Sequence, residues 1–188
     1  MEHIAKRVVI TGLGVVAPNG IGKDEFWNAL KSGKSGIGNI TRFDASLYST
    51  QIAGEVKNFE PEKYMEPKTI KRMARFSMFG LAAAKMAAED AGLDTRSEDP
   101  DRMAAVMGMA VQSLDVVVET YDDLVAKGPD RVNPFSVAKY APNAVVQHIC
   151  IELGIKGRSM MISPGCSSSS NAIGNSYEMI RNGLYDVV

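Results

Sequence analysis

The 188-residue chain is poor in cysteine and histidine, with two of each. The two cysteines lie in different local contexts, which gives no disulfide framework, and no spaced group of cysteines and histidines indicates a metal site. The formal net charge is −1 without any block of basic residues, so nothing in the pattern favours nucleic acid. No apolar run approaches the ~20 residues that cross a bilayer, and the N-terminus has no secretory apolar segment. We therefore expect a cytoplasmic protein with no metal, no nucleic-acid partner and no membrane partner.

What the chain does contain is a globular composition, 45% hydrophobic and 23% charged, over enough residues to bury one core. Strand-like apolar runs alternate with helix-like stretches, which predicts an α/β fold with a mainly parallel sheet. The predicted strands are 7–11, 103–109 and 159–163, and the predicted helices are 24–30, 69–91, 114–126, 143–153 and about 167–182. Residues 186–188 begin a further apolar strand where the chain stops. We therefore expect a sheet that is incomplete at its C-terminal end, in a chain that is part of something larger or needs a second chain.

Cys166 is the strongest candidate for chemistry. It follows a short predicted strand and the turn Pro164-Gly165, and it stands at the first turn of the predicted helix 167–182. Unpaired backbone N–H groups and the positive end of the helix dipole favour a thiolate there, and the thiolate is the nucleophilic form of cysteine. The residues alone also allow an inert, small buried side chain. Cys150 lies in the apolar helical stretch 145–153 and is predicted to be inert.

A glycine pattern near the N-terminus points to a different function. Residues 12–17 (Gly-Leu-Gly-Val-Val-Ala) fit G-x-G-x-x-A after a predicted strand, which is typical of dinucleotide binding. That motif needs a helix to begin at its second glycine, and the turn Pro18-Asn19-Gly20 opposes one. Asp24 comes too early for the acidic residue that follows the motif. A nucleotide-dependent enzyme is therefore the weaker of the two hypotheses.

Short pieces along the whole chain resemble the N-terminal half of the beta-ketoacyl-acyl-carrier-protein synthases, most closely the elongating type II enzymes. The pieces occur in the family's order and include 7–14, 27–36, 42–44, 53–56, 71–73, 90–93, 133–135, 157–159 and the turn at Cys166. The resemblance implies a thiolase-like fold of two related halves. Residues 1–188 would then form a single N-terminal half-domain, with the C-terminal half absent and no cofactor required.

The same resemblance implies a ping-pong mechanism at Cys166. This residue would accept an acyl group from an acyl-carrier protein, and malonyl-carrier-protein would then decarboxylate and condense with it. The backbone N–H of Cys166 would form part of the oxyanion hole. The family's two histidines, lysine and glycine-rich loop belong to the C-terminal half, so this chain alone is expected to be inactive in condensation. His3 lies in the N-terminal tail, and His148 is predicted to be structural.

Three further expectations follow from the resemblance. Val111 and Phe135 are candidates for lining the acyl pocket, with ordinary core and loop packing as the alternative. The strand 159–163 is expected to pair across a homodimer, or a complementary C-terminal-half chain completes the unit. Pro164-Gly165 replaces the family's usual Thr-Ala, and the serines after Cys166 are more typical of modular polyketide synthases. A non-catalytic partner subunit is the alternative function, although such subunits typically lose the cysteine.

Overall fold

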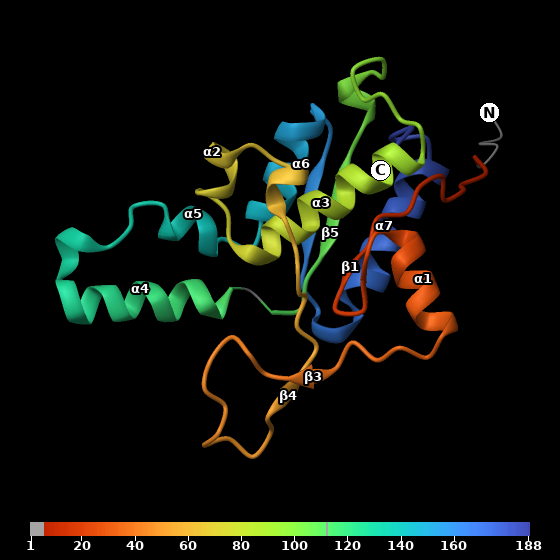
Figure 1. Ribbon diagram of the computed structural model, residues 1–188. Coiled ribbons are helices and arrows are strands. Elements are labelled where there is room, and N and C mark those ends of the chain that lie inside the picture. The colour runs from red at the N-terminus through yellow and green to blue at the C-terminus, as the bar shows by residue number, and fades with distance from the viewer. Residues whose placement is uncertain (1–5, 112) are drawn as a thin grey trace.

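The computed structural model describes residues 6–111 and 113–188, so His3 lies outside the described residues (Figure 1). Seven α-helices are described in these ranges: α1 (Lys23–Lys31), α2 (Pro67–Ile70), α3 (Arg75–Asp90), α4 (Leu114–Lys127), α5 (Ser136–Tyr140), α6 (Ala144–Leu153) and α7 (Ser168–Arg181). The strands are β1 (Val16–Ala17), β2 (Gly20–Ile21), β3 (Gly38–Asn39), β4 (Ile52–Ala53), β5 (Ala105–Gly108) and β6 (Ser159–Ile162). Single 3₁₀ turns occupy Pro61–Lys63, Pro100–Arg102, Pro129–Arg131 and Gly165–Ser167. None of the helices in the described ranges has the length and apolarity that a bilayer crossing requires.

The centre of the fold is a parallel pair of strands, as predicted. β5 and β6 run side by side with Ala105 opposite Ser159 and Gly108 opposite Ile162. A parallel bridge from Met103 to Val187 continues the pairing toward the chain's last residues. Helices cover both faces, because Ala105 and Met107 pack with α3 and α6 while Gly108 meets the start of α7. The carboxyl ends of both strands therefore point toward the segment that carries Cys166.

The hydrophobic core lies between α3, α6 and β5. Leu81 on α3 and Val145 on α6 are buried at its centre. The other buried residues of this cluster are Met65, Met73, Ala82, Ala105, Val146 and Ile149. Leu81 has no solvent-exposed surface. The two helices pack together because each presents small or branched apolar residues at helical spacing on one face. The helices predicted at 24–30, 114–126 and 143–153 are confirmed as α1, α4 and α6.

The strand predicted at 7–11 is wrong. This segment is irregular, and Val9 and Ile10 are 59% and 80% exposed. β-branched residues favour extended backbone, but a strand also needs a neighbouring strand to pair with its backbone N–H and C=O groups. No partner strand is described beside this segment. Just downstream the chain lies directly on α3: a Cβ added at Gly14 would come 1.9 Å from the carbonyl oxygen of Ala83.

The single helix predicted at 69–91 is divided in two. α2 begins at Pro67, which suits a first helical position, and ends at Ile70, whereas α3 starts only at Arg75. Ala74 takes an extended conformation (φ −78°, ψ 158°), and this break lets Met73 and Ala74 enter the core. Helical periodicity continues through the break, so the sequence pattern alone does not reveal it.

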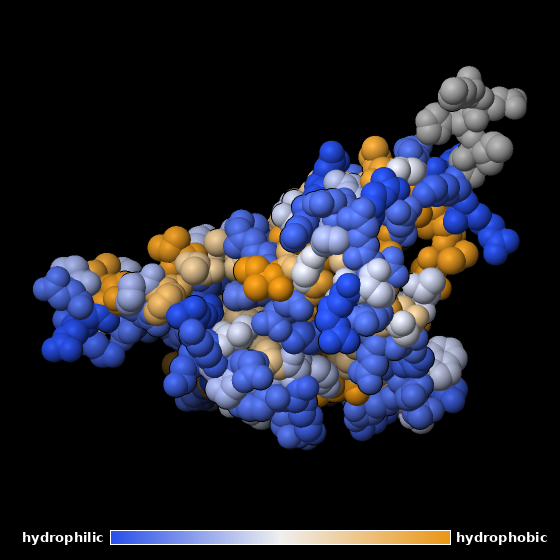
Figure 2. All heavy atoms as spheres, turned by 90° about the horizontal axis from the view of Figure 1, so that it is seen from above, coloured by the Kyte–Doolittle hydropathy of each residue, from blue (hydrophilic) through white to orange (hydrophobic). Residues whose placement is uncertain are grey.

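An arm made of α4, the following 3₁₀ turn and α5 projects away from the core (Figure 1). Its surface carries many apolar side chains, and hydrophobic residues are visible along the arm in Figure 2. The exposed members are Leu114, Val117, Val118, Tyr121, Leu124, Val125, Val137 and Tyr140. α4 is amphipathic, yet in this chain much of its apolar surface faces solvent.

Asp186 ties the chain's last residues to the start of β5. Its carboxylate accepts hydrogen bonds from Arg102 Nε and Nη2, each at 2.8 Å, and from Lys6 Nζ at 2.8 Å. The Arg102 guanidinium, and then the Lys6 ammonium, hold the pKa of Asp186 well below its usual range. The ionised Asp186 carboxylate therefore stabilises the folded state. Since its folded-state pKa is depressed, this contribution is present above the unfolded pKa of ~3.9 and is progressively lost as the pH falls toward the folded-state pKa.

We therefore expect Asp186→Asn to make thermal stability depend less steeply on pH in the acidic range. Wild type should lose thermal stability from about pH 4 downward partly through Asp186, and the variant should lose less over the same interval. Thermal unfolding followed by circular dichroism between pH 2 and 7 measures this. Asp122→Asn, an exposed α4 residue outside this network, is the matched control. An equally steep dependence on acidic pH in wild type and Asp186→Asn would contradict the expectation.

Candidate functional site

Cys166 lies on the turn that joins β6 to α7. β6 ends at Ile162, and Cys166 is the middle residue of the 3₁₀ turn Gly165–Ser167, which runs directly into α7 at Ser168. Its side chain is exposed to solvent. The predicted strand, turn and helix are therefore confirmed, with the helix beginning one residue later than expected. The thiol stands just before a 14-residue helix, where a reagent in solution can reach it.

The turn depends on a glycine and on two serines. Gly165 has φ +76°, a left-handed conformation that glycine adopts without strain. The Ser168 hydroxyl and backbone N–H both donate to the Gly165 carbonyl oxygen, the hydroxyl at 2.5 Å. Asn171 Nδ2 donates to the carbonyl oxygen of Ser167 at 2.9 Å. These contacts hold the backbone on both sides of Cys166.

β5 approaches the same turn from the sheet. A Cβ added at Gly108 would come 2.3 Å from the Ser168 carbonyl oxygen. Any other residue at position 108 would therefore push the start of α7 away from the strand. Gly108 thus allows a close contact between the sheet and the helix that follows Cys166.

Cys150 stands in a different environment, as predicted. It lies on α6, is half-buried and packs against the core. Burial raises the pKa of its thiol, which disfavours the nucleophilic thiolate. His148, on the same helix, is also half-buried; burial lowers its pKa, and the charge of Glu152 partly opposes this.

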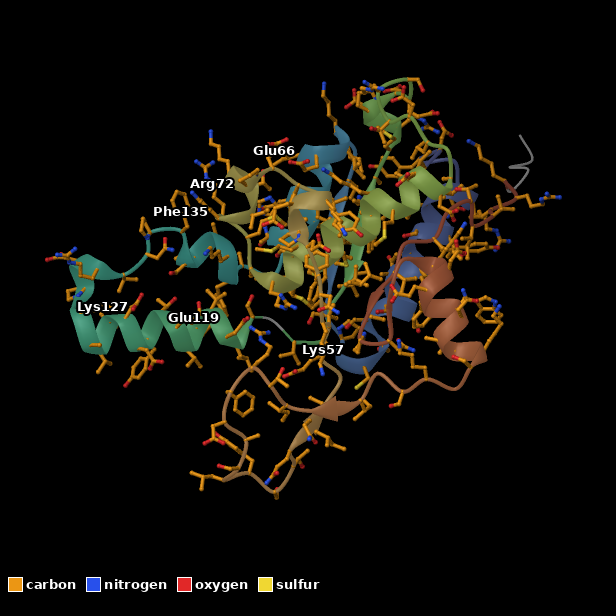
Figure 3. The ribbon with its side chains drawn as sticks, in the orientation of Figure 1. Lys57, Glu66, Arg72, Glu119, Lys127 and Phe135 are labelled. Carbon is orange, nitrogen blue, oxygen red and sulfur yellow. The ribbon has the colours of Figure 1, made fainter. Side chains whose placement is uncertain are left out.

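The candidate pocket residues Val111 and Phe135 lie at the surface of this chain. Val111, just after β5, is 66% exposed, and Phe135, at the start of α5, is 44% exposed. The Arg72 guanidinium carbon lies 5.3 Å from the centre of the Phe135 ring (Figure 3). This cation–π contact joins the end of α2 to the arm. A role for either residue in an acyl pocket stays a prediction.

A cleft of about 490 Å³ lies elsewhere, between the β1–β2 hairpin, residues 34–38 and the segment 55–64. Lysines and glutamates line much of it, among them Lys57, which Figure 3 labels. Cys166, Val111 and Phe135 are not among its lining residues. In residues 6–111 and 113–188, no three histidine, cysteine or acidic side chains gather closely enough to hold a metal ion.

The glycine pattern at 12–17 does not form a dinucleotide-binding turn. Instead of a helix, the chain enters the β1–β2 hairpin, in which Ala17 pairs with Gly20 across the predicted turn. Gly12 and Gly14 serve close packing against the backbone of α3. The nucleotide-binding hypothesis therefore loses the local geometry that it requires.

Comparison with known proteins decides the family. Residues 5–188 match the family model "Beta-ketoacyl synthase, N-terminal domain". The chain belongs to the beta-ketoacyl synthase family. It is 36% identical, over 97% of its length, to 3-oxoacyl-[acyl-carrier-protein] synthase 2 of Vibrio cholerae, of which it covers 44%.

Solved ketosynthase structures share the fold of this synthase domain. The ishigamide ketosynthase/chain length factor superposes with a TM-score of 0.85 at 29% identity, over 96% of this chain and 45% of that one. A type II polyketide ketosynthase in complex with its acyl-carrier protein superposes with a TM-score of 0.79 at 22% identity, over 96% of this chain and 49% of that one; at that identity the likeness shows the fold alone. The fold is thus thiolase-like α/β with a parallel sheet, as predicted, and the chain spans less than half the length of these proteins.

Two contacts at the turn of this synthase domain were not foreseen from the sequence. Ser168 is one of four consecutive serines, and only its burial distinguishes it from the exposed Ser167, Ser169 and Ser170. Gly108 lies inside the strand predicted at 103–109. A glycine inside a predicted strand is the sequence signal that could have indicated this close approach of another backbone.

Proposed function

We propose that Cys166 is the acyl acceptor of a 3-oxoacyl-acyl-carrier-protein synthase, and that this chain supplies its N-terminal half. The observation that carries the proposal is the exposed thiol on the turn between β6 and α7, in a family whose relatives are named for this reaction. The only other cysteine of the sequence is half-buried in a helix and has a raised pKa. An accessible thiol that can ionise is the requirement for covalent acyl transfer.

The first half-reaction transfers the acyl group to sulfur. The Cys166 thiolate attacks the carbonyl carbon of an acyl thioester, forming a C–S bond and a tetrahedral oxyanion. The carrier's C–S bond then breaks, and the carrier thiolate leaves and takes up a proton. The backbone N–H of Cys166 donates to the oxyanion, which stabilises charge where it develops.

The second half-reaction makes the carbon–carbon bond. Malonyl-carrier-protein loses carbon dioxide, and the electron pair left on carbon attacks the Cys166 thioester. The C–S bond to Cys166 breaks as the new bond forms, which releases a 3-oxoacyl-carrier-protein and restores the thiolate. We assign the groups that promote decarboxylation to the C-terminal half of the relatives, so this chain is expected to stop at the acyl-enzyme unless that half is supplied.

The proposed partner in both steps is an acyl-carrier protein bearing an acyl or malonyl thioester. A ketosynthase of the same fold is known in complex with its acyl-carrier protein, which supports this kind of partner. We propose Val111 and Phe135 as residues that line the acyl pocket once further protein surface covers them. Their exposure in this chain is compatible with a pocket completed from outside.

A second protein surface is proposed to complete the unit, either a second copy of the chain or a complementary C-terminal-half chain. Within the described residues β6 pairs only with β5, so one edge of β6 offers backbone groups for another strand. The apolar surface of the α4–α5 arm supports the same proposal, since large exposed apolar patches mark interaction sites.

The proposed acyl acceptor is tested by incubating the chain with an acyl N-acetylcysteamine thioester and measuring its intact mass. We expect a mass gain of one acyl group, and peptide mapping should place it on Cys166. Cys150→Ser should be acylated like wild type. The Cys150 thiol that this substitution removes is half-buried, and its raised pKa disfavours the thiolate. Cys166→Ala should gain no mass.

Acylation of Cys150 in wild type, or full acylation of Cys166→Ala, would reject the proposal. Absence of acylation while iodoacetamide still modifies Cys166 would instead favour a non-catalytic partner subunit. Condensation with malonyl-carrier-protein is measured separately, with and without the C-terminal half.

A further inference from the structure

Ser168 is the buried hydroxyl nearest in sequence to Cys166. It is 2% exposed, whereas the neighbouring serines 167, 169 and 170 are exposed. Its Oγ donates to the Gly165 carbonyl oxygen at 2.5 Å, and its backbone N–H donates to the same oxygen. One residue therefore directs two donors at a single carbonyl.

That carbonyl shares a peptide unit with the N–H of Cys166. A peptide unit is planar and trans, so its C=O and N–H point in opposite directions along fixed lines. Holding the Gly165 oxygen therefore sets the direction in which the Cys166 N–H points. This N–H is the group that the proposed function assigns to the oxyanion.

The turn has little else to hold this peptide. Gly165 sits in a left-handed conformation, and apart from its chain neighbours no atom would lie within 4 Å of a Cβ placed on it, so the space beside its α-carbon is open. Ser168, in contrast, is anchored, because its own carbonyl oxygen lies against Gly108 at the end of β5. The restraint on the peptide thus passes from the sheet through Ser168 to Gly165.

We propose that Ser168 is a positioning residue that orients the backbone N–H of Cys166 toward the oxyanion of acyl transfer. This inference rests on the proposed function of Cys166 and adds the side chain that prepares its backbone. Acyl transfer from a thioester forms an oxyanion, but alkylation of the same thiol by iodoacetamide does not. The two reactions therefore separate orientation of the N–H from reactivity of the sulfur.

The kinetic test compares Ser168→Ala with Ser170→Ala, an exposed serine two residues further along α7. We expect Ser168→Ala to slow acyl transfer to Cys166 by roughly tenfold, less than the 10²–10³-fold loss on removing an oxyanion donor outright. Its alkylation rate should stay within about twofold of wild type. Ser170→Ala should match wild type in both reactions. Equal slowing of transfer and alkylation in Ser168→Ala, or an unchanged transfer rate, would overturn the proposal.

A spectroscopic test does not depend on acylation. Labelling with ¹⁵N-cysteine marks only the two cysteine amides of the chain. In Ser168→Ala we expect the Cys166 amide resonance to shift and its hydrogen exchange to accelerate, while the Cys150 amide stays unchanged as the internal control. An unmoved Cys166 amide would overturn the role of Ser168 even if Cys166 is acylated. If wild type is not acylated at all, the proposed function fails, and this measurement still decides whether Ser168 orients the peptide.

Discussion

Leu81→Ala is expected to lower the free energy of unfolding by about 3–4 kcal/mol. Leu81 is fully buried between α3, α6 and β5, so its removal loses apolar burial and leaves a cavity that neighbouring side chains fill only in part. For a chain of this size the melting temperature should fall by about 6–16 °C. Urea unfolding followed by circular dichroism measures the change.

Leu47→Ala is the matched control for the core substitution. Leu47 is 95% exposed in the loop between β3 and β4, so the same change should alter stability by no more than about 0.5 kcal/mol. Equal effects of the two substitutions would show that the α3–α6 contact is not the core of the molecule.

Gly108→Ala is expected to destabilise the chain by about 1–3 kcal/mol and to disturb the turn at Cys166. The new methyl group would meet the Ser168 backbone oxygen, which lies in a helix and cannot rotate aside as a side chain can. α7 must then move away from β5, and the residues at its start move with it. Unfolding measurements and the rate of Cys166 alkylation report on the two effects.

Gly174→Ala offers the same substitution with the opposite expected sign. Gly174 lies inside α7, and apart from its chain neighbours and the nearby backbone of the helix itself no atom would come within 4 Å of the added methyl group. Alanine is favoured over glycine in a helix interior by about 0.8–1 kcal/mol, so this variant should be more stable than wild type. Destabilisation of both variants alike would point to α7 itself rather than to its contact with β5.

The sequence predicted what depends on local chemistry. α1, α4 and α6 have helical periodicity within their own residues, and the turn at Pro164-Gly165 has its residues in the order that such a turn favours. The position of Cys166 between a strand and a helix could therefore be predicted. The resemblance of the chain to the beta-ketoacyl synthases rests on many short sequence pieces, and the family match over residues 5–188 confirms it.

What the sequence did not predict depends on partners far along the chain. Residues 7–11 have the composition of a strand, but the ladder that would make them one is not present among the described residues. The break before α3 coincides with the burial of Met73 and Ala74, and burial depends on segments distant in sequence. Ser168 could not be told from its neighbours, because the four serines are identical in sequence and differ only in burial, which the fold decides.

Because the chain has only two cysteines, a single fluorophore can be attached at Cys166 without engineering a new site. One of the two thiols is exposed at the junction of β6 and α7, and the other is half-buried with a raised pKa. At neutral pH a thiol-reactive fluorophore therefore meets Cys166 first and reports from the turn, with Cys150→Ser removing the remaining background. Arrival of a carrier protein, a second copy or a missing half can then be followed as a change in that fluorescence, without introducing a new attachment site.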